Sequence, residues 1–479
     1  MTRVFVANRG EIALRIIDAA QRLGLETVLG ISTADRDTLG ARRADRVITL
    51  GPPRASDSYL NIPAVVEAAA GTGCTLVHPG YGFLAERADF AEACAENGLT
   101  FVGPAPQALR ALGDKLAARR LAESVGVPVS AGGPTQTAEE AENLARTIGF
   151  PVLVKAAHGG GGRGMKLVHE PAELVGAWQM ASSEAHASFG DGTVFLERFV
   201  EDAKHVEVQV LGDAHGHVVH LGERECSVQF RYQKVIEEAP CAALPPVTRS
   251  LLHESAVRIA RALRYTGLGT VEFLYDVDRD ALAFLEVNPR IQVEHPVTEA
   301  VTGIDLVREH LLVALGEPLR LTQDEVRVTG HAIEARITAQ DPSRGLVPSP
   351  GPVTRWRPSA AGGLRLDSHV YEGYRFPPFY DALMGKQIAW GTDRDDAVGR
   401  MRRALADFDV DGVTTSLPLL RWILDEPDYA ANAVTTRWLD TAMAAGRYPA
   451  EPADAPTAAA QPVVAATTAS ATTTPEEGR

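Results

Sequence analysis

Four glycines in a row after Lys155 could bind the phosphates of a nucleotide. The run, 159–162, follows a short apolar segment and is followed by Arg163. Consecutive glycines let backbone N–H groups approach phosphate oxygens without a Cβ atom in the way, and the flanking cations can add charge-assisted hydrogen bonds. No G-K-[ST] follows, and the next segment has the pattern of a strand, so neither a P-loop nor a dinucleotide-binding fingerprint is indicated. A flexible hairpin tip is the alternative, but the flanking Lys and Arg favour phosphate binding.

Polar residues alternate with valines in the segment KHVEVQV, residues 204–210. Successive side chains of a strand point to opposite faces of the sheet. The valines are therefore expected in the core, and His205, Glu207 and Gln209 are expected to share the other face.

Two carboxylates and an amide follow the same rule further along the chain. Glu286 and Asn288 alternate with apolar residues, Leu285 among them, and Glu272 lies on the preceding strand segment across a turn at 276–280. The three polar residues are expected to be neighbours on one face, with Leu285 on the opposite face. Mg²⁺ is usually held by one or two carboxylates together with substrate phosphates. A solvated face with salt bridges is the alternative, but three adjacent polar positions on apolar strands favour a metal site.

The same spacing continues through Arg290, Gln292 and Glu294. The rigid, bidentate fork of an arginine suits a small planar oxyanion. A carboxylate among cations is a candidate general base. The segment therefore predicts an anion site with Glu294 as its base.

The chain as a whole has the composition of a soluble globular protein. Its 479 residues, 45% hydrophobic and 23% charged, predict about three domains. The net charge of −15 argues against a nucleic-acid-binding surface. The four cysteines show no metal-ligand spacing and are expected to be reduced. No apolar run is long enough to span a membrane and no targeting segment is indicated, so we expect a cytoplasmic protein that does not bind membranes.

The pattern of short strands and helices predicts an α/β and α+β protein of several domains. Residues 1–113 alternate buried strands with helices, which is typical of a doubly wound parallel sheet. Residues 114–328 contain long alternating strands with hairpin turns, which indicates antiparallel sheets, and a helical segment at 298–315 is expected to close this region. Residues 329–448 predict a third, mixed unit. The Ala-, Thr- and Pro-rich tail, 449–479, is expected to be disordered.

Through the motifs described above, the chain resembles the biotin carboxylases. These are ATP-grasp enzymes found as subunits of acetyl-CoA carboxylase and within pyruvate and acyl-CoA carboxylases. The resemblance covers roughly residues 1–445, and its many ordered blocks make it specific. The blocks are ANRGEIALRI (7–16), HPGYGFLAE (78–86), GDK (113–115), KAAHGGGGRGM (155–165), KHVEVQV (204–210), QKVIEEAP (233–240), EVNPRIQVEHPVTE (286–299), GHAIEARI (330–337), PPFYDALMGK (377–386) and DGVTT (411–415). It implies an ATP-grasp domain at 114–328, between an N-terminal domain and the C-terminal domain of a biotin carboxylase.

The resemblance also implies which residues bind each ligand. ATP would contact Lys115, Lys155, Gly161, Gly162, Glu197, Arg198, Phe199, Val200, His205, Tyr232, Glu272 and Glu286. Mg²⁺, or Mn²⁺ in its place, would be held by Glu272, Glu286 and Asn288. Bicarbonate would be bound by Lys234, Arg290, Gln292 and Val293. Biotin would contact Tyr81, Gln229 and Arg336. The catalytic residues would be Lys234, Arg290, Glu294 and Arg336.

The implied reaction starts with Glu294, which would deprotonate bicarbonate for attack on the γ-phosphate of ATP. The product, carboxyphosphate, would break down to CO₂ and phosphate, and phosphate would take the N1′ proton of biotin. Arg336 would stabilise the biotin enolate. Phosphoryl transfer depends mostly on positioning and charge neutralisation, and the cations and metal ligands of this chain supply both.

One block departs from the family. The family usually reads Q-R-R-H-Q-K where this chain has Gln229, Phe230, Arg231, Tyr232, Gln233 and Lys234. Phe230 removes a cation, and Tyr232 replaces a histidine that lies near the nucleotide. Lys234 and Gln229 are kept, so the departure bears on nucleotide affinity more than on bicarbonate chemistry.

The partners implied are a separate biotin carboxyl carrier protein, carboxyltransferase subunits and a second copy of this chain. No carrier motif occurs in the sequence. Acetyl-CoA carboxylase and fatty acid synthesis are the expected context. The alternatives are a component of a propionyl-CoA, other acyl-CoA or urea carboxylase, or a nucleotide-binding regulatory protein without turnover. The retained Lys234, Arg290, Glu294 and Arg336 argue against the regulatory role.

Overall fold

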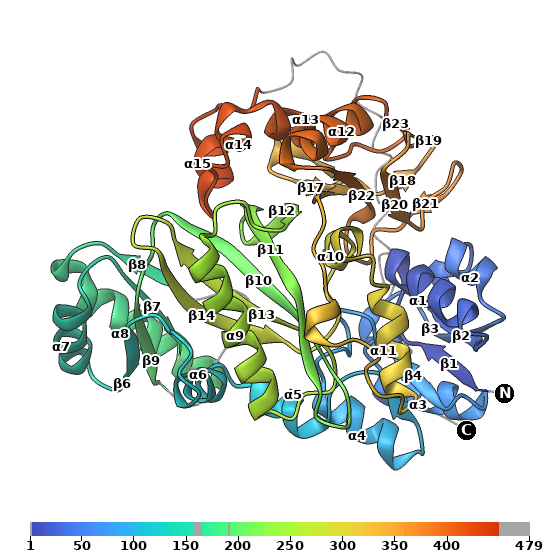
Figure 1. The fold of residues 1–479 in the computed structure, drawn as a ribbon, viewed down its shortest axis with the longest axis horizontal. Helices are drawn as coiled ribbons and strands as arrows, with labels where there is room; N and C mark the ends of the chain where they lie inside the picture. Colours follow the sequence, from blue (N-terminus) through green and yellow to red (C-terminus); the bar gives the residue numbers. More distant parts are fainter. Residues whose placement is uncertain (1, 157–164, 190–191, 360, 450–479) are drawn as a thin grey trace, which may run out of the picture.

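The computed structural model describes residues 2–156, 165–189, 192–359 and 361–449 (Figure 1). Gly161 and Gly162, which are predicted to bind ATP, lie outside these ranges, as does the predicted tail from residue 450. Within the ranges, no helix is both long enough and apolar enough to cross a membrane.

The first unit is a parallel sheet with helices, as the alternating pattern predicts. Its strand order is β3-β2-β1-β4-β5, and every pairing is parallel. The strands are β1 (Arg3–Val6), β2 (Glu26–Ser32), β3 (Arg46–Gly51), β4 (Leu76–His78) and β5 (Thr100–Phe101). The helices are α1 (Gly10–Arg22), α2 (Leu39–Arg43), α3 (Ile62–Gly71), α4 (Ala88–Glu96) and α5 (Pro106–Gly113). Asn61 begins α3 by accepting a hydrogen bond from the Ala64 amide, and Gly24 follows α1 with a positive φ.

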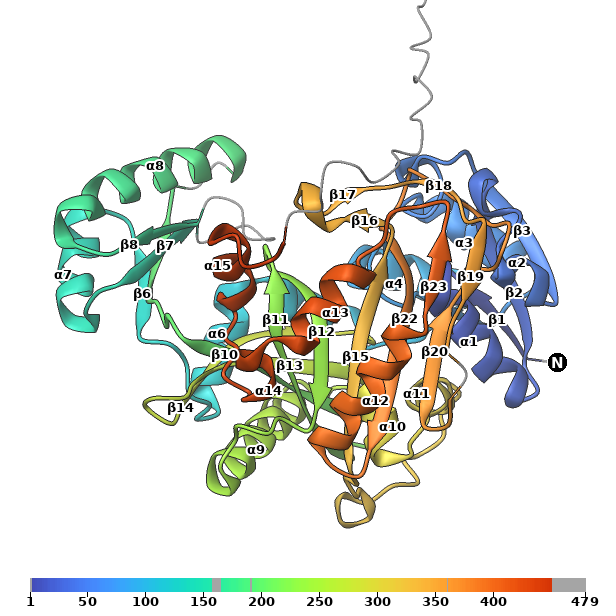
Figure 2. The same ribbon diagram turned by 90° about the horizontal axis from the view of Figure 1, so that it is seen from above.

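A small antiparallel sheet stands apart at the left of Figure 2. Its order is β6-β9-β7-β8. The strands are β6 (Gly132–Thr135), β7 (Val152–Ala156), β8 (Lys166–Val168) and β9 (Val194–Arg198), and its helices are α7 (Ala138–Ile148) and α8 (Pro171–Phe189). Helix α6 (Lys115–Ser124) precedes it and is capped by Asp114, which accepts hydrogen bonds from the Leu116 and Ala117 amides.

An eight-stranded sheet forms the centre of the molecule. Its order is β14-β13-β10-β11-β12-β15-β22-β20. The strands are β10 (Ala203–Gly212), β11 (Val218–Phe230), β12 (Gln233–Ala239), β13 (Gly267–Asp276), β14 (Ala281–Asn288), β15 (His331–Thr338), β20 (Leu364–Ser368) and β22 (Leu383–Gly391). Because β12 pairs with β15, the sheet continues across the predicted boundary at residues 328 and 329. The predicted domain limits stay predictions.

Helices and short strands complete the chain. The helices are α9 (Pro246–Ala262), α10 (His295–Thr302), α11 (Leu306–Ala314), α12 (Arg394–Ala406), α13 (Leu417–Asp425), α14 (Pro427–Ala430) and α15 (Trp438–Ala444). The short strands are β16 (Gln340–Asp341), β17 (Val347–Pro348), β18 (Gly351–Pro352), β19 (Arg355–Arg357), β21 (Arg375–Phe376) and β23 (Asp409–Asp411).

The valine face of β10 lies in the core, as its period-two pattern predicts. Val206, Val208 and Val210 are at most 1% exposed and pack against Leu252 and Ile259 of α9. The polar residues on the opposite face of β10 are buried as well. Buried polar groups need partners, and here they meet the residues of the cleft described below.

Two details of the predicted structure are wrong. The segment 298–315 is not one helix, because Gly303 ends α10 in the left-handed conformation and Asp305 begins α11 by accepting a hydrogen bond from the Arg308 amide. Leu285 does not lie in the core: it is the extra residue of a β-bulge, since Glu286 pairs with Glu272 while Phe284 pairs with the next residue, Phe273. Phe284 is therefore the buried residue, and Leu285 is 40% exposed and lines the cleft.

Glu238 on β12 fastens the large sheet to α12. Its two oxygens accept hydrogen bonds from Arg394 at 2.8 and 2.9 Å, and one of them lies 2.9 Å from His331 Nε2. Burial alone would raise the pKa of Glu238, but His331 and Arg394 outweigh burial and lower it from 4.5 to about 2. The carboxylate is therefore ionised at neutral pH.

Glu238→Gln is expected to lower the free energy of unfolding by about 3–5 kcal/mol at neutral pH, because Arg394 loses its charge partner in a buried site. A carboxylate with a lowered pKa stabilises the fold above its unfolded value, 4.5, and this contribution is lost as the pH falls towards about 2. The difference between variant and wild type in urea denaturation should therefore shrink over that range. The exposed Glu254→Gln serves as the control and should change stability by less than about 0.5 kcal/mol. A difference that does not vary with pH would contradict the assignment.

Candidate active site

A cleft of about 1550 Å³ is lined by residues from all three predicted domains. Arg9 comes from the N-terminal sheet unit, Lys155 from the small sheet, and Lys234 and Arg336 from the large sheet. The cleft collects cations and carboxylates on otherwise apolar strands, which is the arrangement expected of an active site.

Lys234, near the start of β12, is the charge centre of the cleft. Its Nζ atom lies 2.6 Å from Glu207 Oε2, 2.6 Å from Glu294 Oε1 and 3.1 Å from Glu272 Oε1. Burial would lower the pKa of Lys234, but the three carboxylates outweigh burial and hold it well above its usual value. The ammonium group is therefore permanently charged.

The three carboxylates respond in the opposite direction. Burial works to raise the pKa of each, but Lys234 and the cations near it outweigh burial. The pKa of Glu207 falls to about 2, and those of Glu272 and Glu294 are lowered as well. All three are ionised at neutral pH, so Glu294 can accept a proton.

Glu294, the predicted base, precedes α10 and is 1% exposed. Its second oxygen, Oε2, accepts a hydrogen bond from Arg336 Nη2 at 3.0 Å. Arg336 also donates through Nε to Glu237 Oε1 at 2.5 Å. The base therefore lies between two cations, Lys234 and Arg336.

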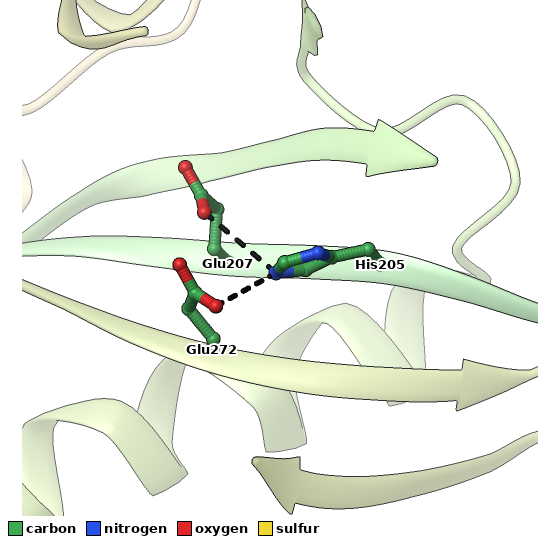
Figure 3. A group of neighbouring side chains, drawn as sticks. All are labelled: His205, Glu207 and Glu272. Carbon is green, nitrogen blue, oxygen red and sulfur yellow. Dashed lines mark ion pairs between the residues drawn. The ribbon is translucent and has the colours of Figure 1, made fainter. Parts of the chain in front are cut away.

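Glu272 on β13 gathers the predicted metal face. It lies opposite Glu286, and its Oε1 accepts hydrogen bonds from the side-chain amides of Asn288 at 2.8 Å and Gln292 at 3.2 Å. Figure 3 shows the imidazole of His205 pointing at two carboxylates: Nε2 lies 3.1 Å from Glu272 Oε2 and 3.8 Å from Glu207 Oε2. The prediction that these polar residues share one face is confirmed.

The residues predicted to hold metal can be tested by their donor chemistry. Glu272 and Glu286 offer hard carboxylate oxygens side by side, which suits Mg²⁺. The amide nitrogen of Asn288 faces Glu272, while its oxygen accepts from Arg290 Nη2 at 3.1 Å. The two carboxylates fit the metal, and coordination by Asn288 stays a prediction. His205, Glu207 and Glu272 also lie close enough to share an ion, but the Lys234 ammonium group already contacts both carboxylates.

Arg290, the predicted oxyanion ligand, is fixed by partners from two units. Its Nε donates to Glu86 Oε1 at 2.6 Å, and Glu86 belongs to the N-terminal unit. Its Nη1 donates to Gln292 Oε1 at 2.7 Å. The carbonyl oxygen of Val293 accepts from Lys386 Nζ at 2.9 Å. The predicted bicarbonate residues are therefore brought together.

The predicted nucleotide contacts line the same cleft. Lys155 Nζ lies 2.7 Å from Glu197 Oε1, and Lys115 Nζ lies 3.1 Å from Glu286 Oε2. Further residues of this wall are Arg198, Phe199 and Val200. Both lysines are paired with carboxylates in the cleft, and phosphate oxygens would compete for the same ammonium groups.

The predicted biotin contacts also line the cleft. Tyr81 donates a hydrogen bond from its hydroxyl to Glu11, and Gln229 Nε2 lies 2.8 Å from His205 Nδ1. Tyr232 is 75% exposed at the tip of the β11–β12 hairpin, where its φ is +66°. Phe230 is buried in the core of the third unit. The two departures from the family thus have separate environments, and only Tyr232 lines the cleft.

Several residues of the site carry no clear signal in the sequence. The strand pattern places Glu207 on the right face but gives it no role, and its partner Arg224 is 0% exposed and donates to it at 2.6 Å. Glu86 and Lys386 act on Arg290 and Val293 from distant parts of the chain. Their positions inside two of the family blocks are the one signal that could have found them.

Family comparisons agree with this geometry. Residues 1–109 match the family described as "Biotin carboxylase, N-terminal domain", residues 114–322 match "Carbamoyl-phosphate synthase L chain, ATP binding domain", and residues 334–441 match "Biotin carboxylase C-terminal domain". Together these matches cover most of the chain. This chain belongs to the biotin carboxylase family. It is an ATP-dependent carboxylase, and therefore a ligase.

Individual relatives span nearly the whole chain. The biotin carboxylase of Nostoc sp. is 46% identical over 439 residues, which are 91% of this chain and 98% of the relative. Biotin carboxylase 1 of Bacillus subtilis is 45% identical over 441 residues, or 92% and 98% of the two chains. A pyruvate carboxylase component from Methanothermobacter thermautotrophicus is 43% identical over 92% of this chain and 89% of its own.

Solved structures give the same result. A biotin carboxylase–β,γ-ATP complex from Campylobacter jejuni matches with a TM-score of 0.87 and 42% identity, over 92% of this chain and 98% of that one. The biotin carboxylase domain dimer of the 2-oxoglutarate carboxylase from Hydrogenobacter thermophilus, solved with MgADP, ADP and bicarbonate, matches with a TM-score of 0.86 and 41% identity over the same shares. The predicted family and fold class are confirmed.

Lys234→Met is expected to lower the free energy of unfolding by about 3–5 kcal/mol at neutral pH, because three buried carboxylates lose their shared cation. In the wild type these carboxylates have lowered pKa values, so their contribution is present above about pH 4.5 and is lost as the pH falls. The destabilisation measured by urea denaturation should therefore be smaller at about pH 3 than at about pH 7.

The exposed pair of Arg320 and Glu317 supplies the control. Arg320→Met removes a cation of comparable length at the surface and should change stability by less than about 0.5 kcal/mol at either pH. Equal effects of the two substitutions would show that Lys234 is not the charge centre of the cleft.

Proposed function

We propose that this chain carboxylates biotin attached to a separate carrier protein, as the first half-reaction of an acetyl-CoA or other acyl-CoA carboxylase. The observation that carries the proposal is the position of Glu294, a buried carboxylate bound on one oxygen by Lys234 and on the other by Arg336. The two cations can bind the bicarbonate anion, and the carboxylate between them can remove its proton.

Bicarbonate would be bound by Arg290, Lys234, Gln292 and Val293. Glu294 would take its proton, and the oxygen set free would attack the γ-phosphorus of ATP as the bond to ADP breaks. The carboxyphosphate so formed would break down to CO₂ and phosphate, and phosphate would take the N1′ proton of biotin. Arg336 would stabilise the resulting enolate, and the N1′ nitrogen of the enolate would attack CO₂ to form carboxylated biotin.

The metal would be held by Glu272 and Glu286, with Asn288 as a further ligand. When bound, Mg²⁺ neutralises charge on the phosphates of ATP. The cations of this chain complete that neutralisation, because Lys115 and Lys155 line the same cleft and Lys115 lies beside Glu286. The predicted adenine contacts at 197–200 and the glycine run at 159–162 would hold the rest of the nucleotide.

The partners are a biotin carboxyl carrier protein and carboxyltransferase subunits in the cytoplasm, with a second copy of this chain as the dimer partner. The dimer of the Hydrogenobacter relative supports the last. The pyruvate carboxylase component from Methanothermobacter supports a second candidate, in which the carboxyltransferase partner acts on a 2-oxo acid. The carboxylation of biotin is common to both.

Glu294→Gln is expected to lower bicarbonate-dependent ATP hydrolysis by about 100-fold or more, because the amide cannot accept the proton. The measurement is ADP release with and without free biotin at saturating Mg-ATP, with Glu254→Gln as the exposed control. Wild-type turnover should rise when biotin is added. If biotin does not raise wild-type turnover, the proposed function is wrong. If Glu294→Gln keeps its activity, the assignment of Glu294 as the base is wrong.

Tyr232→Ala is expected to raise the KM for ATP by about 2- to 10-fold, since a stacked aromatic contact contributes about 0.5–1.5 kcal/mol. The KM for bicarbonate should not change, because Tyr232 has no contact with Lys234, Arg290 or Glu294 among the hydrogen bonds and ion pairs of the described residues. Val247→Ala, at an 81% exposed position on α9, is the control. An unchanged KM for ATP would remove Tyr232 from the nucleotide site.

A further inference from the structure

Two carboxylates face one another behind the catalytic centre. Glu237 on β12 and Glu334 on β15 are directly opposite residues of neighbouring antiparallel strands, and both are 0% exposed. Opposite side chains of paired strands have Cβ atoms about 4.5–5.5 Å apart. Helix α10 covers this face of the sheet, where Val297 packs with Ile388, the residue opposite Glu334 on β22.

Most oxygens of this pair have no hydrogen-bond donor. Glu237 Oε1 accepts from Arg336 Nε, but among the described residues Glu237 Oε2 and both oxygens of Glu334 lack a partner. An ionised carboxylate that is buried without donors is strongly unfavourable, and such a group keeps its proton instead.

Each cation near the pair also contacts groups outside the pair. Arg336 is shared between Glu237 and Glu294, and Lys234 is surrounded by Glu207, Glu272 and Glu294. Lys386 on β22 donates to the Val293 carbonyl and lies 3.3 Å from Glu11.

The remaining titratable neighbours add no positive charge. Burial holds the pKa of His295, at the start of α10, well below its usual value, so the ring is neutral. Burial raises the pKa of the Cys226 thiol on β11, so this group is uncharged as well. Burial and the neighbouring carboxylates raise the pKa of Glu237 to about 7, and the pKa of Glu334 is also held well above its usual value.

We propose that Glu334 and Glu237 keep one proton between them, with Glu334 as the neutral acid, and that this pair positions Arg336 against the base. With Glu334 neutral, Glu237 is the single carboxylate that anchors Arg336 from behind. Arg336 Nη2 then reaches Glu294, and Nη1, which has no hydrogen bond among the described residues, is left for the substrate. An ionised Glu334 would compete with Glu294 for the same guanidinium group.

The proposal rests on the proposed function for the role of Arg336, but its first test does not depend on activity. Infrared spectroscopy of the full chain at about pH 7.5, where exposed carboxylates are ionised, should show the carbonyl stretch of a protonated carboxylic acid that shifts in D₂O. Glu334→Gln should remove this band, whereas the exposed Glu254→Gln should keep it. No such band in the wild type, or a band that survives in Glu334→Gln, would overturn the assignment of the proton.

Turnover tests the positioning role. In the wild type the KM for biotin should rise at alkaline pH, where Glu334 loses its proton. Glu334→Gln has the shape of the neutral acid, so its KM for biotin should stay within about twofold of the wild type and should not rise at alkaline pH. Glu237→Gln removes the anchor of Arg336 and should raise the KM for biotin by about tenfold or more. Bicarbonate-dependent ATP hydrolysis without biotin should also fall in Glu237→Gln, because Arg336 contacts the base, whereas the exposed Glu254→Gln should change it by less than about twofold.

The outcomes separate the two proposals. A protonated-acid band that is lost in Glu334→Gln would support the proton assignment whatever the turnover shows. Wild-type turnover that does not rise with biotin would overturn the proposed function. Biotin-dependent turnover in which Glu237→Gln leaves the KM for biotin unchanged would overturn the positioning role alone.

Discussion

The Lys234 ammonium group brings together three buried carboxylates, and the rest of the cleft depends on this contact. Glu207, Glu272 and Glu294 come from β10, β13 and the turn before α10. Without a shared cation, their charges would repel one another strongly in a buried site. With this cation, Glu294 is ionised and held in place. The same ammonium group connects Glu272 on β13, which faces the metal site, to Lys234 on β12.

The local features of this arrangement follow from the sequence because strand periodicity is a local property. The alternation in 204–210 correctly separates the valine face from the face with His205 and Glu207. The same rule fails at Leu285, since a bulge is set by how two strands pair, and a single strand's pattern does not contain its partner's register. The split between α10 and α11 does have a local signal, because Gly303 and Asp305 are a typical helix end followed by a typical helix start.

The contacts that tune the site cannot be predicted from local patterns. Glu86 binds Arg290 from 204 residues away, and Glu237 binds Arg336 across 99 residues. Such pairs depend on the packing of whole units, so no spacing rule reports them. Spacing and chemical type mark Glu294 as a candidate base, whereas the role of Arg336 comes only from the resemblance to the family.

The continuity of the large sheet has a consequence for how the enzyme can move. Glu272, Lys234 and Arg336 stand on β13, β12 and β15 of one hydrogen-bonded sheet, whereas Lys155 stands on the separate small sheet. The distances among the first three residues are therefore fixed by the hydrogen bonds of one sheet. A displacement of the small sheet would change the contacts to the nucleotide, while the spacing between the two cations and the metal carboxylate stayed constant.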